Sequence, residues 1–541
     1  MTDSSTLIRR WEQLAAERAS FESTWRDIAG QLLGRRDVLG ARGTAQGMGG
    51  ARQDARLYDG TSMQAADTLA ASLHGLVTNP SMRWFALRFE DAALDADDGA
   101  RRWLAASEDR LYDAFAAPTA GHAQACHEFY LDLGAFGTAG MFLGDAPGRG
   151  LVFSARALGE LAIAEDAAGR VDTVFRRFTL TARQARQEWG GAAGEKIARA
   201  VEAGRAEEKF EFLHAVYPRG EREAGRRDGA HMALASCYVS LADRALVAEG
   251  GFHEMPYLVA RWSKDAGETY GRGPGWNALA DQKMLHAMSK TVIVAAQKAV
   301  DPPLLVADDG VVLPVRTVPG GLNFGRMDGR GPFIQPLTVP ARLDIGFEMM
   351  EQRRQAVRAA FHADVLQVMR DPRMTAAQVY EIAGEMMRVM GPVLGRLQSE
   401  FLGPMIARGF ALLARQGALP PAPPQMAGAR LKVEYVSPLA RAQKAGQADA
   451  VMRTYEPALR LAQAAPEVLD NLDHDEALRV LAEANGAPPK ILKDRNQVAD
   501  ARRRREGEAR QAAMKGDLMM MAEGAGKALP ALAKLGDRAA D

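Results

Sequence analysis

The sequence predicts an α+β fold that is mainly α, and three observations carry that prediction. Apolar residues recur at spacings of three or four over long stretches, which is typical of helices that pack on one side. From residue 151 to residue 270 the period changes to that of strands, with turn residues between short runs. Between residues 303 and 340, glycine, proline and short β runs separate two long helical patterns.

The composition is that of an ordinary globular protein with several domains. Of the 541 residues, 47% are apolar and 25% are charged. Lys+Arg and Asp+Glu both number 68, so tight wrapping of nucleic acid, which usually needs a basic excess, is not expected. Cys126 and Cys237 are far apart in the sequence and suit a reducing compartment. No apolar run is long enough to predict a membrane span, and the first residues lack a signal-peptide pattern.

The first 150 residues are expected to be mainly helical. Turn residues and capping signals mark where the helices begin and end, as at Thr61 and Asn79-Pro80. Helices are predicted at residues 6–33, from 61 to 79, at 100–117 and at 120–136. The Gly- and Arg-rich stretch from Gly34 to Gly50 is predicted to be a loop.

Residues 151–270 are expected to form a β-rich part on the scale of a domain. Residues 167–170 read as the turn of a hairpin, and a helix is predicted near 181–203. Strands are predicted at residues 151–156, 161–165, 171–179, 210–217, 231–240, 244–249 and 257–262.

Two long helices are predicted in the centre of the chain, at residues 275–300 and from 344 to about 370. Pro274 suits the first turn of the first helix, and Pro372 ends the second. The apolar face of the first helix is expected to hold Ala280, Met284, Met288, Val292, Ala295 and Ala299. The apolar face of the second is expected to hold Phe347, Met350, Val357, Phe361, Val365 and Val368.

The chain after Pro372 is predicted to form a second, interrupted helix. Thr375 and Gln378 have the spacing of a capping box, in which each side chain bonds the other's main-chain amide. Gly391-Pro392 is expected to kink this helix and Gly403-Pro404 to break it. One strand near Leu431 and helices at 442–464 and 474–484 follow a Pro-rich linker at 419–424.

Enzyme and metal motifs fail on inspection. The residues from Gly271 to Gly275 lack the spacing of a phosphate-binding loop, and no second histidine follows His253-Glu254 at the spacing of a zinc helix. The neighbours His122, Cys126 and His127 are expected to be core residues. The alternating acids around Asp473 are expected to mark the start of a helix, and Arg502–Arg505 a solvated helix face.

Five parts of the chain resemble the podovirus-type bacteriophage portal proteins, the head-to-tail connector family. Two of them are the pair of helices that bracket the β runs at 303–340 and the stretch GAPPKILKDRNQVADARRRREGEARQ from Gly486. The other three are residues 56–89 (RLYDGTSMQAADTLAASLHGLVTNPSMRWFALRF), residues 373–420 (RMTAAQVYEIAGEMMRV to RQGALP) and the sequence LKVEYVSPLA from Leu431. The resemblance covers roughly residues 5–505 in the family's order, although no single motif is a fingerprint.

The resemblance implies a portal fold and a division of the chain into parts. These parts are a helical wing at 1–150, a β-rich wing at 151–270, stem helix 1 at 271–300, a small β clip at 301–340, stem helix 2 at 341–370, a tunnel loop with a long kinked helix and a return to the wing at 371–440, and a helical C-terminal crown and tail at 441–541.

The resemblance also implies a structural role, with no enzyme activity and no cofactor. The family forms a ring, expected to be a dodecamer, at one capsid vertex, through which double-stranded DNA is packaged and ejected. Its partners would be terminase, capsid protein and tail adaptor or nozzle proteins. It would be made in the host bacterial cytoplasm and would be located in the virion. Residues expected near DNA are Arg370, Arg373, Lys283, Lys290, Arg354 and Arg358. The alternative is a multidomain soluble enzyme, such as a hydrolase using carboxylates, without a recognisable motif.

Overall fold

A computed structural model describes most of the chain, which divides into two compact units. The described residues are 3–34, 57–146, 148–223, 226, 228–306, 314–316, 324, 334–336, 343–364, 389–426, 428–436, 438–484, 491–493, 495, 497–512 and 514–515. The first unit contains residues 1–84 and 111–418, and the second contains residues 85–110 and 419–541.

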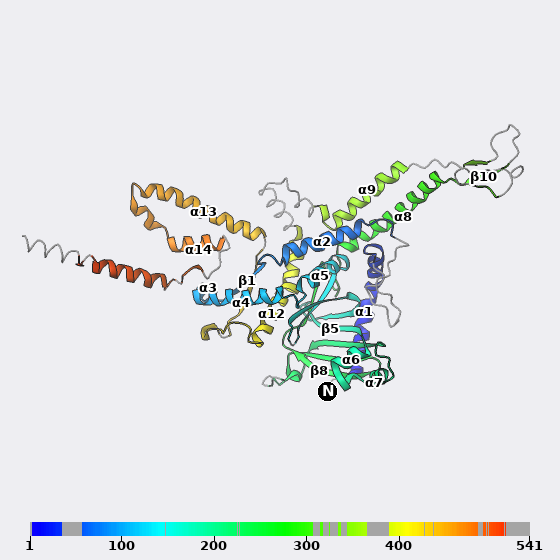
Figure 1. Cartoon of the computed structure of the whole chain (residues 1–541), viewed down its shortest axis with the longest axis horizontal. Helices are drawn as coiled ribbons and strands as arrows, with labels where there is room; N and C mark the ends of the chain where they lie inside the picture. Colours follow the sequence, from blue (N-terminus) through cyan, green and yellow to red (C-terminus); the bar gives the residue numbers. More distant parts are fainter. Residues whose placement is uncertain are drawn as a thin grey trace, which may run out of the picture. The chain divides into compact units, whose positions relative to one another are not determined.

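Two antiparallel sheets lie in the first unit (Figure 1). The five-stranded sheet has the order β4-β5-β6-β7-β8, and the three-stranded sheet has the order β3-β2-β9. The strands of the larger sheet are β4 (Leu161–Glu165), β5 (Val171–Thr181), β6 (Lys209–Pro218), β7 (Leu234–Ser240) and β8 (Ala245–Phe252). Those of the smaller sheet are β2 (Thr138–Ala146), β3 (Gly150–Arg156) and β9 (Tyr257–Arg261).

Helices cover both faces of the five-stranded sheet, because its strands alternate apolar side chains between the two faces. On one face, Leu7 and Ile8 of α1 (Ser4–Gln31) pack with Phe175, Leu213 and other buried residues. On the other face, α6 (Ala182–Trp189) and α7 (Glu195–Glu202) pack against Phe212. A single helix over 181–203 was expected; instead Gly190 and Gly194, with φ of 58° and 117°, separate two helices.

A third core forms where α2 (Thr61–Val77) and α5 (His122–Phe136) pack together. The Phe129 ring of α5 stacks on the Phe401 ring at a centroid distance of 4.0 Å, and both residues are buried. Helix α5 ends at Gly137, which has φ of 84°, and the chain then enters β2. Strand β2 was not predicted, because its sequence directly follows a helix and is buried on both faces for most of its length.

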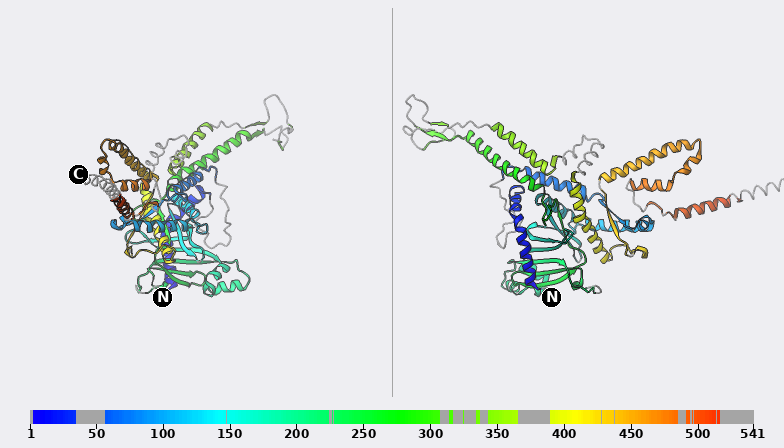
Figure 2. Two further views of the ribbon diagram at one scale, coloured as in Figure 1. Left: turned by 60° about the vertical axis from the view of Figure 1, so that its left-hand side comes forward. Right: turned by 180° about the vertical axis from the view of Figure 1, so that it is seen from behind.

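The central helices α8 (Pro274–Val300) and α9 (Leu343–Ala360) run side by side toward a small β hairpin (Figure 2). The hairpin pairs β10 (Leu304–Val306) with β11 (Ile334–Pro336), in the region where short β runs were predicted between the two helices. We call α8 and α9 the stem. Helix α9 ends at Ala360 rather than near residue 370, because His362 has a left-handed φ of 54°.

The chain from residue 389 to residue 415 is helical throughout, which corrects the expected break at Gly403-Pro404. A π-helical turn at Gln398–Leu402 leads directly into α12 (Gly403–Arg415). Pro404 has no N–H, and its ring would clash with the carbonyl four residues earlier in a regular α-helix. The wider π turn lets the helix continue past Pro404. Gly391 and Pro392 lie in the helical residues 389–397; their kink remains a prediction.

The second unit is held by strand pairing between distant parts of the chain. Strand β1 (Phe85–Phe89) pairs with β12 (Leu431–Tyr435), and the amide of Leu87 donates to Glu108 Oε1 at 2.6 Å. Its helices are α3 (Ala92–Ala96), α13 (Pro438–Ala462), α14 (His474–Ala484) and the first part of α4 (Asp98–Ala116). Asp473 accepts from the amides of Asp475 and Glu476, so the expected helix start is confirmed.

Candidate channel-forming stem

The root of the stem is fixed by close packing of α8 against α5. The Trp276 indole donates to the carbonyl of Phe136 at 2.8 Å. Gly275 lies so near α5 that a Cβ atom there would be 2.2 Å from the carbonyl oxygen of Ala135. Only glycine permits this approach, and the first turn of α8 is therefore seated on the end of α5.

The buried side of α8 holds three polar residues beside Ala278 and Leu285, and it is not the predicted apolar face. Gln282, His286 and Ser289 are all at most 5% exposed. The Gln282 amide donates to the carbonyl of Asp59 at 3.2 Å, and His286 Nε2 lies 2.8 Å from the carbonyl of Gln31. Ser289 donates to the sulfur of Met350 on α9. Each of the three side chains thus has at least one partner, which makes its burial tolerable, although Gln282 Oε1 has none among the described residues.

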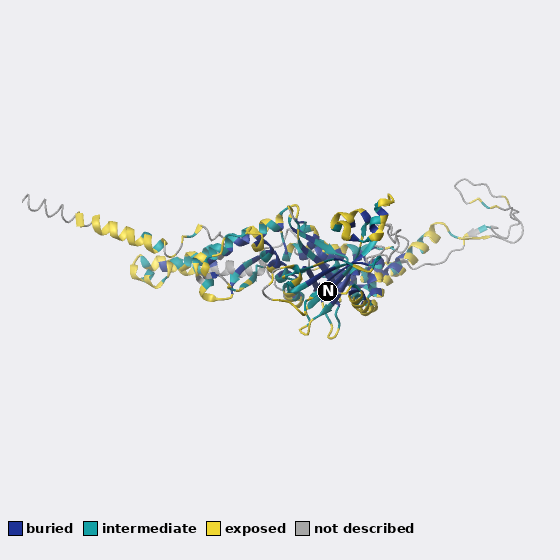
Figure 3. Ribbon diagram, turned by 90° about the horizontal axis from the view of Figure 1, so that it is seen from below, coloured by how far each residue is buried: buried dark blue, intermediate teal, exposed yellow. Residues whose placement is uncertain are grey.

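Several apolar residues of the stem, by contrast, are exposed in the single chain, although Met288, Val292 and Ala295 of the predicted face are half-buried. Met284 was expected to be packed and is 49% exposed, and Phe347 was expected to be packed and is 56% exposed. Ala280 is exposed as well. The other large apolar residues exposed on the stem are Ile293, Val294, Val300, Ile345 and Met349. Figure 3 shows the contrast with the strands of the sheets, most of whose residues are buried or intermediate. Met350, Val357 and Phe361 are buried as predicted.

Three of the six cations expected near DNA form ion pairs inside the chain. Lys283 pairs with Asp27, and Arg358 pairs with Glu351 at 3.2 Å. Arg354 bonds Asp59 at 2.9 Å and Glu351 at 3.3 Å. Lys290 is exposed and forms no ion pair with a described residue. Arg370, Arg373, Thr375 and Gln378 lie outside the described residues.

Asp59 links the start of α2 to α9 and is the buried member of these pairs. Burial acts to raise the pKa of its carboxyl, but hydrogen bonds from Thr61 and Arg354 outweigh burial and lower it. The carboxylate is therefore ionised at neutral pH and attracts Arg354 in a site where solvent screening is weak. Sequence reasoning placed Asp59 at a helix start but gave no sign of its partner 295 residues away.

A second anchor joins the helix at 389–415 to the sheets. Arg261, at the end of β9, is buried and bonds Glu400 of the π turn and Glu165 of β4. Lys264 also bonds Glu165 at 2.6 Å. Nothing in the sequence pattern pointed to this cluster, because its members lie on three elements that are distant in the chain.

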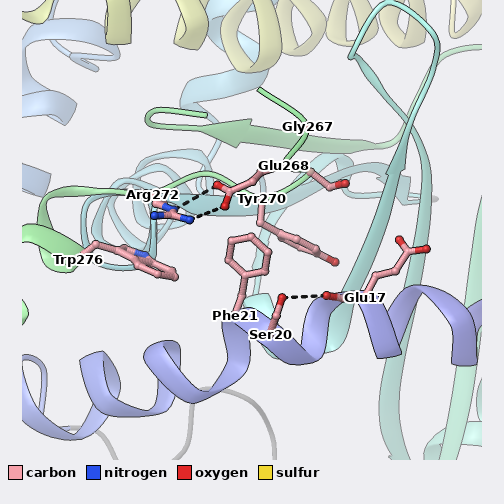
Figure 4. Close-up of a pocket in the computed structure, with 9 residues that line it drawn as sticks. Glu17, Ser20, Phe21, Gly267, Glu268, Tyr270, Arg272 and Trp276 are labelled. Atoms are coloured by element: carbon pink, nitrogen blue, oxygen red, sulfur yellow. Dashed lines mark hydrogen bonds and ion pairs between the residues drawn. The ribbon is translucent and has the colours of Figure 1, made fainter. Parts of the chain in front are cut away.

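An aromatic pocket of about 490 Å³ lies beside the root of the stem. Figure 4 shows Phe21 of α1 facing Tyr270 and Trp276, with Arg272 bonded to Glu268 at its edge. The Arg272 guanidinium also lies 5.3 Å from the centre of the Trp276 ring. Glu17 and Ser20 complete the polar part of the lining. The described lining holds no histidine or cysteine, so it lacks the usual partners of a nucleophile.

His122 and Cys126 are buried, as their expected core role requires, whereas His127 is only half-buried. His122 is 6% exposed, and its ring lies parallel to those of Trp84 and Phe115. Burial lowers the pKa of His122 to about 4. Within the described ranges, no three histidine, cysteine, aspartate or glutamate side chains are arranged to hold a metal ion. The helices in these ranges are all too short or too polar to cross a membrane.

Known proteins match the chain over nearly its whole length. The model of the family described as "Bacteriophage head to tail connecting protein" matches residues 4–492. A probable portal protein of Bordetella phage BPP-1 is 31% identical over 95% of this chain and 93% of its own length. The portal protein of Salmonella phage epsilon15 is 29% identical over 94% of this chain and 92% of its own length.

Solved structures give more distant matches. One is the neck of an empty gene transfer agent particle computed with C6 symmetry, with a TM-score of 0.37, 13% identity, and coverage of 72% of this chain and 85% of that one. Another is the virion of a native gene transfer agent particle, with a TM-score of 0.36, 12% identity, and coverage of 78% and 89%. The family match and the curated relatives suffice: the chain belongs to the bacteriophage head-to-tail connecting proteins.

Proposed function

We propose that copies of this chain form a portal ring at the head–tail vertex of a phage, around a channel for double-stranded DNA. Membership in the connector family supports this role, and both curated relatives are named portal proteins. The role is passive, because the chain would supply a shaped channel while a separate protein supplies the energy for packaging.

The exposed apolar residues of the stem are the observation that carries the proposal. Helix α8 buries Gln282, His286 and Ser289 within the chain, and the two stem helices leave Met284, Ile293 and Phe347 to solvent. Exposed apolar surface of this kind usually marks a site of association. Neighbouring stems packed around an axis would cover these side chains, and burial of each one would be worth about 1.5–3 kcal/mol if it were complete.

The finer features of the assembly follow from the family resemblance. The ring would hold twelve copies, and terminase, capsid protein and tail adaptor or nozzle proteins would dock on it. The protein would be made in the host bacterial cytoplasm and then become part of the virion. The β10–β11 hairpin would be the outer end of the channel, where packaging and tail proteins bind.

The channel would present a nearly neutral lining to DNA. Lys283, Arg354 and Arg358 are neutralised by carboxylates of their own chain. Lys290, Arg370 and Arg373 would then be the cations that approach DNA. Each phosphate contact adds salt-dependent affinity, and a ring repeats every contact, so few free cations favour sliding over tight holding.

Two measurements test the proposal. Negative-stain images of the purified protein should show rings with a central hole, and compact single molecules at every concentration would contradict it. Replacement of Arg370 and Arg373 together by alanine should leave ring yield unchanged and reduce the DNA protected from nuclease in each particle. The matched control is alanine at Arg199, an exposed arginine paired with Glu195.

The alternative of a carboxylate-dependent hydrolase would need two carboxylates free to act on one substrate. Glu17 and Glu268 both line the aromatic pocket. Glu268 is committed to Arg272 by two hydrogen bonds, so only Glu17 is available there. The pocket therefore favours no second function.

A further inference from the structure

Arg156, the last residue of β3, is a half-buried cation without a carboxylate of its own. Its Nε atom is buried and has no hydrogen-bond partner among the described residues. The guanidinium lies 5.6 Å from the centre of the Phe142 ring, and no described carboxylate forms an ion pair with it. An unpaired buried donor on a charged group is costly, and native proteins rarely keep one without a reason.

A second arginine increases the imbalance of charge. Arg176 of β5 bonds Glu160 at 2.7 Å and lies over the Phe178 ring at 4.4 Å. Burial, and then the nearby charge of Arg176, lowers the pKa of Arg156. The carboxylate of Glu160 thus acts on two guanidinium groups: it bonds Arg176, and its charge also favours the charged form of Arg156.

The residues around the two arginines provide no further negative charge. His214 lies 2.7 Å from the Tyr257 hydroxyl and 3.0 Å from that of Ser236, and its ring stacks on Tyr238 at 4.0 Å. Burial lowers the pKa of His214 to about 3, so the ring is neutral at pH 7. Burial also raises the pKa of both tyrosines, which therefore stay protonated.

We propose that Arg156 and Arg176 together bind a small free oxyanion, of which inorganic phosphate is the representative, beside Glu160, which bonds Arg176 and follows Arg156 by four residues. A guanidinium presents its N–H groups in a planar fork that matches two oxygens of such an ion. The ion would satisfy Arg156 and balance the second positive charge. The site belongs to the single chain and does not depend on ring formation.

Titration of the full-length protein with sodium phosphate, at constant ionic strength against chloride, tests the site by calorimetry. The wild type should bind phosphate saturably. Arg156→Gln should weaken binding by about ten- to a hundred-fold, the equivalent of one charge-assisted hydrogen bond or two. Arg183→Gln is the matched control, because Arg183 is an exposed arginine paired with Glu207. Glu160→Gln should tighten binding, since it frees Arg176.

Thermal unfolding provides a second readout if calorimetric signals are small. In chloride, Arg156→Gln should unfold at the wild-type temperature or above it, because the variant removes an unpaired cation. In phosphate, the wild type should gain stability and the variant should not. Equal phosphate responses in the wild type and Arg156→Gln, or none in the wild type, would overturn the proposal. If Arg156→Gln does not fold, Glu160→Gln decides: binding no tighter than in the wild type overturns it.

The same phosphate chemistry is present in DNA, so a short duplex is titrated in parallel. Free phosphate should bind in the presence of the duplex as it does alone. A wild type that binds the duplex but not free phosphate, together with an Arg156→Gln variant that no longer binds the duplex, would identify DNA as the ligand. That result would overturn the assignment to a free ion.

Discussion

Arg261 and Glu400 form a two-point ion pair between β9 and the π turn. Arg261 Nη2 donates to Glu400 Oε1 at 2.6 Å, and its Nε donates to Oε2 at 3.0 Å. The amide of Arg261 also donates to Oε2, at 2.9 Å. Since the Arg261 side chain is 1% exposed, the pair fixes the helix at 389–415 to the sheets in a site with little water.

Replacement of Glu400 by alanine should therefore destabilise the first unit. It leaves part of a buried guanidinium and one main-chain amide without acceptors, a change that typically costs about 3 kcal/mol. A lower urea midpoint would be the readout. Arg396→Ala is the control, because Arg396 bonds the same carboxylate from a position that is 33% exposed, and its loss should cost under about 1 kcal/mol. Equal effects of the two variants would show that the Arg261–Glu400 pair contributes no more to the free energy of unfolding than the Arg396–Glu400 pair does.

Gly275→Ala should loosen the root of the stem. The added methyl group would meet the Ala135 carbonyl at 2.2 Å, so α8 or α5 has to move, and overpacking of this kind costs about 1–3 kcal/mol. Gly191→Ala is the matched change, because a Cβ there meets nothing within 4 Å. Thermal unfolding of both variants gives the comparison, and a Gly275 variant as stable as the Gly191 variant would contradict the packing described.

His122 should make the protein sensitive to mild acid. Its pKa is about 4 in the folded protein and about 6.5 when unfolded, so below pH 6.5 the unfolded chain binds a proton that the folded chain does not. Stability is then fully present above pH 6.5 and falls by about 1.4 kcal/mol for each pH unit down to pH 4.

The test compares the pH dependence of urea unfolding in the wild type and His122→Gln between pH 7 and pH 4.5. The variant should be less stable at pH 7, where its looser packing is the main effect, and should lose less stability as the pH falls. His253→Gln, at an exposed position, is the control. Parallel pH profiles for the wild type and His122→Gln would rule out this source of acid sensitivity.

Periodicity predicted most helices and strands of this chain but misplaced the buried side of α8. The pattern of α8 is correct as a helix, yet Met284 is exposed while Gln282 and His286 are buried. The rule that apolar residues are buried assumes that the single chain makes all the contacts. Here Gln282 and His286 bond main-chain carbonyls of residues over 200 positions away, which no local pattern reveals.

The ends of elements and the ion-pair anchors were also beyond local patterns. Pro404 was expected to break a helix, but a π turn accommodates it. The Arg261–Glu400 pair joins residues 139 positions apart. Other features were predictable because each has a strong local signal of proline, glycine or alternating apolar residues. They are the position of the stem, its small β hairpin and the strand at Leu431 that pairs with β1.

Phe347→Ser should separate ring formation from folding. Phe347 lies on α9 and is 56% exposed in the single chain, so its loss should change the free energy of unfolding of the chain by less than about 0.5 kcal/mol. In a ring the same side chain would be covered by a neighbour, and losing it should cost about 1–2 kcal/mol at every interface. Because the ring repeats the interface, ring yield in electron micrographs should fall sharply.

Glu348→Ser, at the next and also exposed position, should assemble like the wild type. Val357→Ser, at a fully buried position of α9, should lower stability as well. Normal rings from Phe347→Ser would mean that this part of the stem faces solvent in the assembly.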